Sequence, residues 1–289
     1  MAQVRIVAPN ISRRLSRTQR QRTSAAVSPE LFDMELRALR RDRAFRNGVE
    51  LFLYERAFAD CLDRIGLVQQ SFRSALLIGC PDPDWPARLG ELADQVDTLD
   101  PGAAFARAAG GTQIVEDELA DESGKYDLCV AIGTLDTVND LPRALAMIRS
   151  ALRPGSFFLG AFAGGDNLPQ LRAAMRVADQ VRGSAVPHVH PRIEAAALAP
   201  LLAAARFTMP VVDVDRVQVS YPSLTRLVDD LRRMGTTNLL SARSRKSMTR
   251  SERTAAINAF ASMQEDGRTT ETFEILHFGA WVATDARQG

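Results

Sequence analysis

The middle of the chain alternates short apolar runs with amphipathic helical segments, and this alternation restricts the fold more than any other feature of the sequence. The clearest runs are typical of strands that are covered on both faces. They are SALLIGC (74–80), YDLCVAIG (126–133) and SFFLGAFAG (156–164), and further strand candidates are QVDTLD (95–100) and TQIVED (112–117). Strands that alternate with helices form a parallel sheet with helices on both faces. The sequence therefore predicts an α/β fold built on a doubly wound, mostly parallel sheet.

Helical segments lie between and after these strands. In residues 139–155 the leucines fall on one stripe, and Asn139 or Asp140 is suited to cap the start of the helix. Residues 166–181 repeat this pattern. Later in the chain we expect a helix bent at Pro200, strands at 210–222 and 272–284, and helices at 223–235 and 249–264. The last two helices are expected to lie together as a lid beside the sheet.

The chain begins with a basic segment, and two helices are expected after it, within residues 30–69. The first of these helices has Leu31, Met34 and Leu39 at helical spacing. Residues 1–29 carry six arginines and no acidic residue. This composition is typical of a disordered basic tail on a bacterial protein and, alternatively, of a mitochondrial presequence. The tail is the preferred interpretation, and it predicts a cytoplasmic protein.

Composition excludes few classes of function. A net charge of +1 argues neither for nor against nucleic acid, and no nucleic-acid partner is predicted. No apolar run is long enough to span a bilayer. The three cysteines, Cys61, Cys80 and Cys129, are far apart, which indicates a reducing compartment without a disulfide framework or a clustered zinc site.

A glycine and an acid in this framework point to a nucleoside ligand. In doubly wound sheets the ligand lies outside the carboxyl ends of the strands, and an acid at the end of the second strand accepts hydrogen bonds from ribose hydroxyls. Gly79 ends the first strand, and Asp100 ends the second, 21 residues later. Any α/β sheet can have a glycine after a strand and an aspartate before a turn, so the spacing by itself leaves both interpretations open.

Several longer stretches resemble the class I S-adenosylmethionine-dependent methyltransferases. Within that superfamily they resemble the branch of the biotin-pathway malonyl-carrier-protein O-methyltransferase and the mitochondrial methyltransferase-like assembly factor for respiratory complex I. The stretches are FDMELRALRRDRA (32–44), 138–174, 211–240 and TFEILHFGAWV (272–282). The VNDLP and GGDNLPQLR blocks are specific to the branch, whereas the glycine and acid pattern belongs to the whole superfamily.

The resemblance implies a Rossmann-like methyltransferase fold with a seven-stranded sheet, N-terminal helices and a helical lid. We expect the chain to divide into a disordered basic tail (1–29), an N-terminal helical cap (30–70) and a methyltransferase-like domain (71–289) with its lid at about 222–266. The implied cofactor is S-adenosylmethionine.

The resemblance also implies which residues bind that cofactor. Gly79 and Cys80 match the start of the family's glycine-rich loop. Asp100 matches the ribose-binding acid, and Glu116 or Asp117 matches the acid near the adenine edge.

The loop departs from the family pattern in ways that weaken cofactor binding. Leu77 stands in place of an aspartate, and Pro81 and Pro83 stand in place of two glycines. Proline has no N–H and fixes φ near −65°, so the loop loses donors and conformational freedom. Asp82 and Asp84 add negative charge that could engage the cofactor's amino group, but the preferred interpretation is that they are polar residues of a tight loop. In addition, Asp136 and Thr137 replace a His–Trp pair that is typical of the branch.

Two functions remain open from the sequence. The first is methyl transfer to a carboxylate or a protein acceptor, such as a carrier protein or a respiratory-complex subunit. The second is a non-catalytic assembly or binding factor that kept the fold, and the branch also holds a member thought to hydroxylate an arginine of a complex I subunit. Methyl transfer needs mainly proximity and orientation, so no catalytic residue is predicted.

Other candidate residues are weaker. His188 and His190 are expected to be polar loop residues rather than metal ligands, and no metal is predicted. His277 is expected to be packed or hydrogen-bonded in the last strand. Tyr221, at the end of a strand, is a candidate to face the substrate. The basic run 243–253 is either solvated surface or a contact for an acidic carrier protein.

Overall fold

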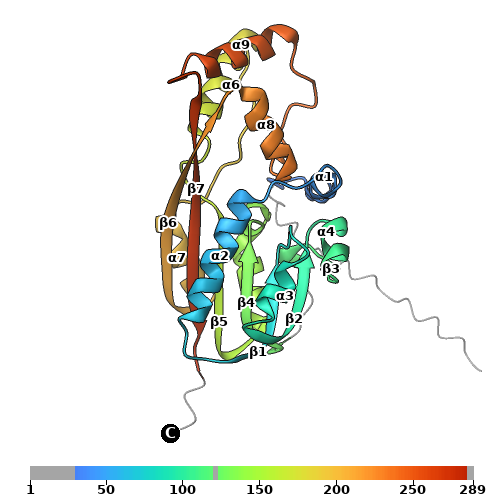
Figure 1. Cartoon of the computed structure of the whole chain (residues 1–289), viewed down its shortest axis with the longest axis vertical. Helices are drawn as coiled ribbons and strands as arrows, with labels where there is room; N and C mark the ends of the chain where they lie inside the picture. The colour runs from blue at the N-terminus through green and yellow to red at the C-terminus, as the bar shows by residue number, and fades with distance from the viewer. Residues whose placement is uncertain (1–29, 120–122, 285–289) are drawn as a thin grey trace, which may run out of the picture.

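The computed structural model describes residues 30–119 and 123–284, which form one sheet flanked by helices and extended by a helical lid (Figure 1). In this described part the sheet has seven strands in the order β3-β2-β1-β4-β5-β7-β6. β7 pairs antiparallel with β5 and β6, and the other pairs are parallel. The strands are β1 (Phe72–Ile78), β2 (Ala93–Asp100), β3 (Thr112–Gln113), β4 (Tyr126–Ile132), β5 (Leu152–Ala163), β6 (Phe207–Tyr221) and β7 (Thr269–Val282). The predicted α/β, mostly parallel, Rossmann-like sheet is confirmed.

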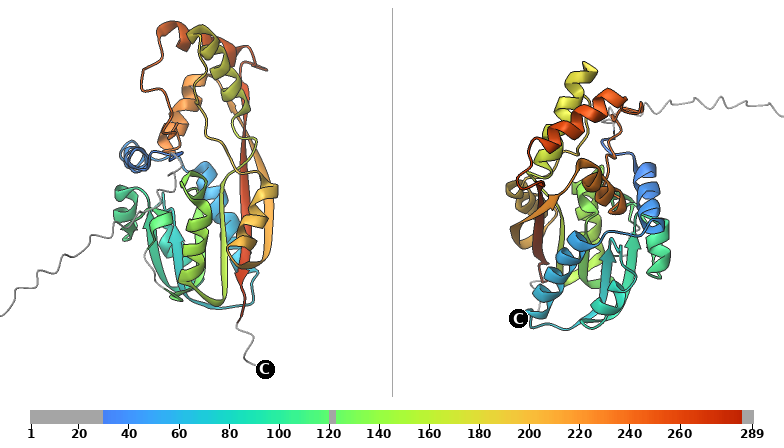
Figure 2. Two further views of the ribbon diagram at one scale, coloured as in Figure 1. Left: turned by 180° about the vertical axis from the view of Figure 1, so that it is seen from behind. Right: turned by 45° about the horizontal axis from the view of Figure 1, so that its top comes forward.

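Helices cover both faces of this sheet (Figure 2). One face packs against α2 (Phe52–Gly66) and α3 (Trp85–Leu89), and the other packs against α5 (Leu141–Ala151) and α7 (Ala195–Ala204). α1 (Met34–Arg46) contacts both α4 (Ala103–Ala108) and α8 (Leu224–Arg233). Short 3-10 turns, η1 (Glu116–Glu118) and η2 (Leu135–Thr137), follow β3 and β4.

The apolar strands form the core because their side chains alternate between the two helical layers. In β1, Leu76 and Ile78 pack toward α5 and α7, whereas Ala75 and Leu77 pack toward α2 and α3. All four side chains are buried. A strand buried on both faces reads as a continuous apolar run, which is why 74–80 was recognisable in the sequence.

The lid contains one helix more than the sequence predicts. α6 (Pro169–Arg182) was expected to cover the sheet, but it packs against α8 and α9 (Arg250–Ala261) around Leu227 and Phe260. The part of β7 that extends beyond β5 fixes this position. The carboxylate of Glu271 accepts hydrogen bonds from the N–H groups of Gln170 and Leu171, at 3.2 and 2.8 Å, and so holds the start of α6 on the β6–β7 ribbon.

The third strand is shorter than predicted. Residues 112–117 were expected to be a strand, but only Thr112 and Gln113 pair with β2, and η1 follows. The chain leaves the sheet there and carries Glu116 into the protein interior, where it is 1% exposed. The predicted tail, residues 1–29, lies outside the described residues. In the described part, no helix has both the length and the apolar character needed to cross a membrane.

Candidate functional site

Gly79 turns the chain at the carboxyl-terminal edge of the sheet. Its φ is 81°, and its N–H donates to the carbonyl of Leu99 at 2.8 Å. A Cβ at this position would lie 2.2 Å from the carbonyl oxygen of Ile132. Only glycine therefore fits between the ends of β1 and β4, and the turn brings the main chain of Cys80 beside the end of β2.

Asp100 ends β2, and its buried carboxylate accepts four hydrogen bonds. Oδ1 accepts from Nε of Arg41 at 2.8 Å and from the N–H of Gly102 at 2.7 Å. Oδ2 accepts from Nη2 of Arg41 at 2.5 Å and from the N–H of Cys80 at 2.8 Å. An ionised carboxylate offers about four acceptor positions. The predicted ribose-binding acid is therefore saturated by groups of the protein itself.

Glu116 is engaged in a similar way by a second arginine. Nη1 and Nη2 of Arg37 donate to its two carboxylate oxygens at 2.6 and 2.7 Å, and Nη2 also donates to the carbonyl of Thr134 at 2.7 Å. The side chains of Arg37 and Glu116 are 3% and 0% exposed. Asp117 lies apart from this pair, where it accepts from the N–H of Asp140 at 3.2 Å. Of the two acids left open by the sequence, only Glu116 joins Gly79, Cys80 and Asp100.

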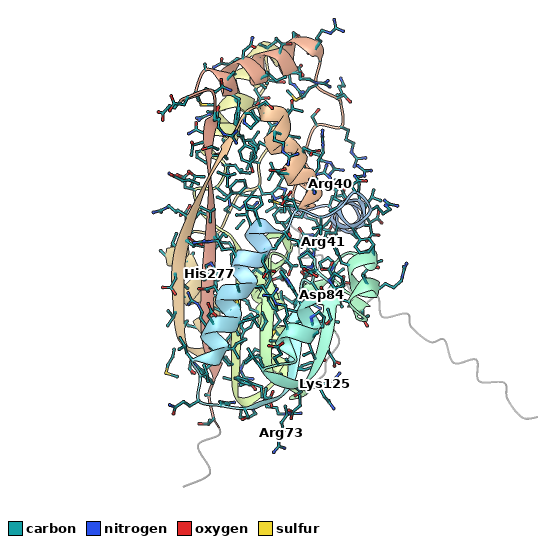
Figure 3. All side chains as sticks on the ribbon, in the orientation of Figure 1. Arg40, Arg41, Arg73, Asp84, Lys125 and His277 are labelled. Atoms are coloured by element: carbon teal, nitrogen blue, oxygen red, sulfur yellow. The ribbon has the colours of Figure 1, made fainter. Side chains whose placement is uncertain are left out.

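α1 brings both arginines to these acids because residues four apart share one face of a helix. Arg41 lies between α1 and the carboxyl ends of the strands (Figure 3). Arg37 and Arg41 are buried, whereas Leu39 is 47% exposed, so the apolar spacing does not mark the buried face of this helix. Burial of a guanidinium is costly unless it is paired and hydrogen-bonded. The face is stable because a carboxylate meets each arginine.

Burial and the attraction of Asp100 change the pKa of Arg41 in opposite directions. Burial alone lowers the pKa of the guanidinium, but the charge of Asp100 and its hydrogen bonds outweigh burial and raise the pKa of Arg41. The ion pair with Asp100 therefore favours the charged form of Arg41.

These residues do not fit S-adenosylmethionine in the arrangement described. In the family the two acids accept hydrogen bonds from the ribose and the adenine, but here Arg41 and Arg37 supply those donors. The N–H of Cys80 is used by Asp100, and Pro81 has no N–H to offer. The arginines of α1, rather than Pro81 or Pro83, pair with the two acids.

The loop after Gly79 leads directly into α3. Asp82 stabilises it, since its carboxylate accepts from the N–H of Asp84 at 2.9 Å and its carbonyl accepts from Sγ of Cys80 at 3.1 Å. Pro81 is buried and Pro83 is exposed. These contacts are those expected of polar residues in a tight loop. Burial, and secondarily the charge of Asp100, raises the pKa of the Cys80 thiol, which keeps it protonated.

An apolar cavity of about 80 Å³ lies at the carboxyl ends of β4 and β5, between α2, α8 and β7. Two acids reach it. Asp136, which replaces the branch's histidine, forms a buried ion pair with Nη1 of Arg192. Glu274 is 4% exposed and accepts from Nε of the exposed Arg216 at 3.0 Å. The cavity therefore combines an apolar body with two carboxylates at its margin, each of which is already paired with an arginine, Arg192 or Arg216.

The two histidines of the 188–190 segment are held separately. His188 lies 2.8 Å from Asp179, and His190 accepts from the N–H of Leu239 at 2.8 Å. Within the described ranges, no group of three or more His, Cys, Asp or Glu residues is arranged to hold a metal ion.

His277 and Tyr221 lie away from the sheet edge that carries Asp100. His277 is buried, as expected, with Nδ1 2.8 Å from a carboxylate oxygen of Asp60 on α2. Tyr221 is buried in the core of the lid beside Phe273, not at a pocket mouth. Burial and the nearby Asp230 raise the pKa of Tyr221 above its ordinary value. Its hydroxyl belongs to the lid interior.

A scan against protein families matches residues 51–212 to a methyltransferase domain. The match covers more than half of the chain. The chain belongs to the methyltransferase-domain family. Its fold agrees with that of the YcgJ protein from Bacillus subtilis (TM-score 0.54, 9% identity, 79% of this chain and 99% of that one). A putative methyltransferase from Bacillus halodurans has the same TM-score at 10% identity, over 78% of this chain and 99% of its own.

Relatives of known name fall in two groups. The mitochondrial arginine-hydroxylase NDUFAF5 of Mus musculus is 32% identical to this methyltransferase-family chain over 91% of it and 82% of the relative. The human protein of the same name is 30% identical over 96% and 85%. A malonyl-[acyl-carrier protein] O-methyltransferase from Xylella fastidiosa is 33% identical, but over only 52% of the chain and 50% of the relative. Both groups belong to the branch that the sequence resembles.

Reasoning from the sequence missed Arg37, Arg41 and Arg192. The two α1 arginines had one usable signal, their spacing of four residues on a helix that precedes the sheet. Nothing in the order of residues links them to acids 59 and 79 positions away. Arg192 had no signal, since it lies 56 residues from Asp136 in an irregular segment.

Proposed function

We propose that this member of the methyltransferase-domain family is a non-catalytic binding or assembly factor that does not use S-adenosylmethionine. One observation carries the proposal: Asp100 and Glu116 are both paired with buried arginines of the same helix. An adenosine would have to displace Arg41 and Arg37 and leave two charged guanidinium groups without partners. Breaking a buried pair costs about 3–5 kcal/mol, so breaking two costs about 6–10 kcal/mol and cancels most or all of the binding energy of a micromolar ligand, about 8 kcal/mol. Cofactor binding is therefore reduced to negligible affinity.

The partner we propose is a protein that inserts a long side chain with a cationic end into the apolar cavity, where that end would share Asp136 and Glu274 with Arg192 and Arg216. Relatives named arginine-hydroxylases act, by that name, on arginine. The apolar walls of the cavity suit the methylene stem of such a side chain, and the carboxylates at the margin suit its charged end. A respiratory-complex subunit is the partner that the resemblance to an assembly factor favours. A cytoplasmic location stays a prediction, since the NDUFAF5 relatives are named mitochondrial.

Methyl transfer to a carboxylate or a protein acceptor is the second candidate function. The observation in its favour is the position of the cavity, which lies at the carboxyl ends of β4 and β5, beside Gly133. This is the sheet edge where ligands of doubly wound folds bind. The candidate requires α1 to move away from Asp100 and Glu116 before a cofactor enters.

Calorimetric titration with S-adenosylmethionine and with its demethylated product separates the two functions. For the wild-type protein we expect no binding heat at millimolar ligand. The double variant Pro81→Gly/Pro83→Gly restores the family's glycines but leaves the arginines in place, and it should also stay silent. The double variant Arg37→Ala/Arg41→Ala frees both acids and is the one expected to gain affinity.

Micromolar binding by the wild-type protein would overturn the proposal in favour of the methyltransferase. Recovery of binding by the glycine variant alone would show that the loop, and not α1, excludes the cofactor. Circular dichroism of each variant establishes that it is folded before its titration is interpreted.

A further inference from the structure

A second cavity, of about 200 Å³, lies on the lid side of the Asp136–Arg192 pair. Apolar side chains of α6 and α8 line it together with Met248; they include Leu171, Met175 and Val228. His190, Arg192 and the loop Thr236–Asn238 also line it. None of the described residues that line this cavity is acidic. The apolar residues therefore suit a hydrocarbon, and His190 and Arg192 suit a polar or anionic group.

His190, one of the residues that line this cavity, has an unused hydrogen-bond donor. Its Nε2 accepts from the N–H of Leu239, so in the neutral ring the proton is on Nδ1. Nδ1 is buried and has no hydrogen-bond partner among the described residues. Burial lowers the pKa of His190 to about 3, and the charges of Arg192, Arg40 and Arg172 contribute. The imidazole is therefore a neutral donor in an electropositive environment.

Arg192, which also lines this cavity, has a second unused donor. Its Nη1 pairs with Asp136, but its Nε is buried and has no hydrogen-bond partner among the described residues. Arg172 and Arg40 add positive charge nearby, and each donates to a main-chain carbonyl. Two buried donors without acceptors are costly, and an anion that accepts from both removes that cost.

We infer that this cavity binds a carboxylate with a hydrocarbon chain, with the carboxylate against Nδ1 of His190 and Nε of Arg192. A carboxylate has two oxygens and can accept from both donors. The hydrocarbon chain lies along the wall of α6 and α8, which selects such a ligand over a bare inorganic anion. The cavity is separate from Asp100 and Glu116, so this inference goes beyond the proposed function and does not depend on it.

Calorimetric titration with octanoate tests the inference, with octanamide as the uncharged probe of the same shape and inorganic phosphate as the bare anion. We expect octanoate to bind at least about tenfold more tightly than octanamide, because a hydrogen bond to a charged group contributes about 1.5–3 kcal/mol, or at least about tenfold in affinity. Phosphate should give no measurable heat, because it leaves the apolar wall uncovered.

Two substitutions locate the carboxylate. His190→Gln keeps an acceptor for the N–H of Leu239 but lacks the donor at Nδ1, and it should weaken octanoate binding about tenfold. Arg192→Lys keeps the positive charge near Asp136 but lacks Nε, and it should have a similar effect. His188→Gln is the matched control, because His188 lines the cavity but is already paired with Asp179. It should leave the affinity within about twofold.

The absence of binding heat when octanoate is titrated into the wild-type protein overturns the inference and does not affect the proposed function. Equal affinity for octanoate and octanamide also overturns it, because the cavity then binds the hydrocarbon chain and does not recognise the carboxylate. Equal losses in His190→Gln and His188→Gln rule out the assigned donor. Should His190→Gln fail to fold, Arg192→Lys decides by the same comparison with octanamide.

Discussion

Replacing Arg41 with methionine tests whether α1 is held to the sheet by its buried ion pair. Methionine keeps most of the length of the stem and removes two charge-assisted hydrogen bonds to Asp100, at 2.8 and 2.5 Å. Each such bond contributes about 1.5–3 kcal/mol, and breaking a buried pair costs about 3–5 kcal/mol. Asp100 keeps the N–H groups of Cys80 and Gly102, so we expect the lower end of this range, about 3 kcal/mol.

Chemical denaturation followed by tryptophan fluorescence measures this loss, since Trp85 is fully buried in the core beside α2. Arg56→Met is the matched control, because Arg56 pairs with Asp215 at 2.5 Å on the surface, where its side chain is 57% exposed. Exposed pairs contribute about 0–1 kcal/mol. A loss for Arg41→Met no greater than that for Arg56→Met would refute the claim that the buried pair fixes α1.

Two further predictions concern the backbone and pH. In chemical denaturation, Gly79→Ala should destabilise the protein by about 2 kcal/mol or more beyond the loss caused by Gly48→Ala. Both glycines have positive φ, but only Gly79 would place a Cβ against the carbonyl of Ile132. Equal losses of stability in the two variants would contradict the crowding argument. The pKa of His190 is lowered by burial to about 3, below its ordinary 6.5, so the unfolded state binds the additional proton. Its contribution to stability is full above about pH 6.5 and is lost as the pH falls toward 3, at about 1.4 kcal/mol per pH unit. Measured between pH 6.5 and 4, the wild-type protein should lose more stability than His190→Gln, and parallel curves would show that the imidazole is not buried in its neutral form.

Most of the sheet was predictable because its strands lie in a uniform environment. A strand such as β4, covered on both faces, needs apolar side chains at every position, and that requirement is visible in YDLCVAIG. The position of α6 was not predictable in the same way. Its apolar stripe matches a helix on the sheet as well as one in the lid, and the contact that decides between them, Glu271 with the start of α6, spans 100 residues.

In the candidate site, too, some residues could be predicted from the sequence and their partners could not. Gly79 and Asp100 could be found because the position of each in the chain follows from a strand end, whereas Glu116 was one of two acids that the family resemblance left open. What those acids bind could not be found, because it depends on which face of α1 is turned inward. Apolar spacing indicates the inward face only when the buried groups are apolar. In α1 the buried face is formed by Arg37 and Arg41, and an exposed Leu39 lies on another side.

The presence of two buried acids, Asp100 and Glu116, has a physical explanation that does not require a cofactor. A buried carboxylate must be paired, because an unpaired one costs several kcal/mol. Where a nucleoside does not supply donors, another part of the chain must supply them, or the carboxylates are left buried and unpaired. α1 supplies them here, with four hydrogen bonds from two arginines to the two acids. An acid at the end of the second strand is therefore evidence of a buried partner, and whether that partner is ribose or arginine is decided by the helix that crosses the end of the sheet.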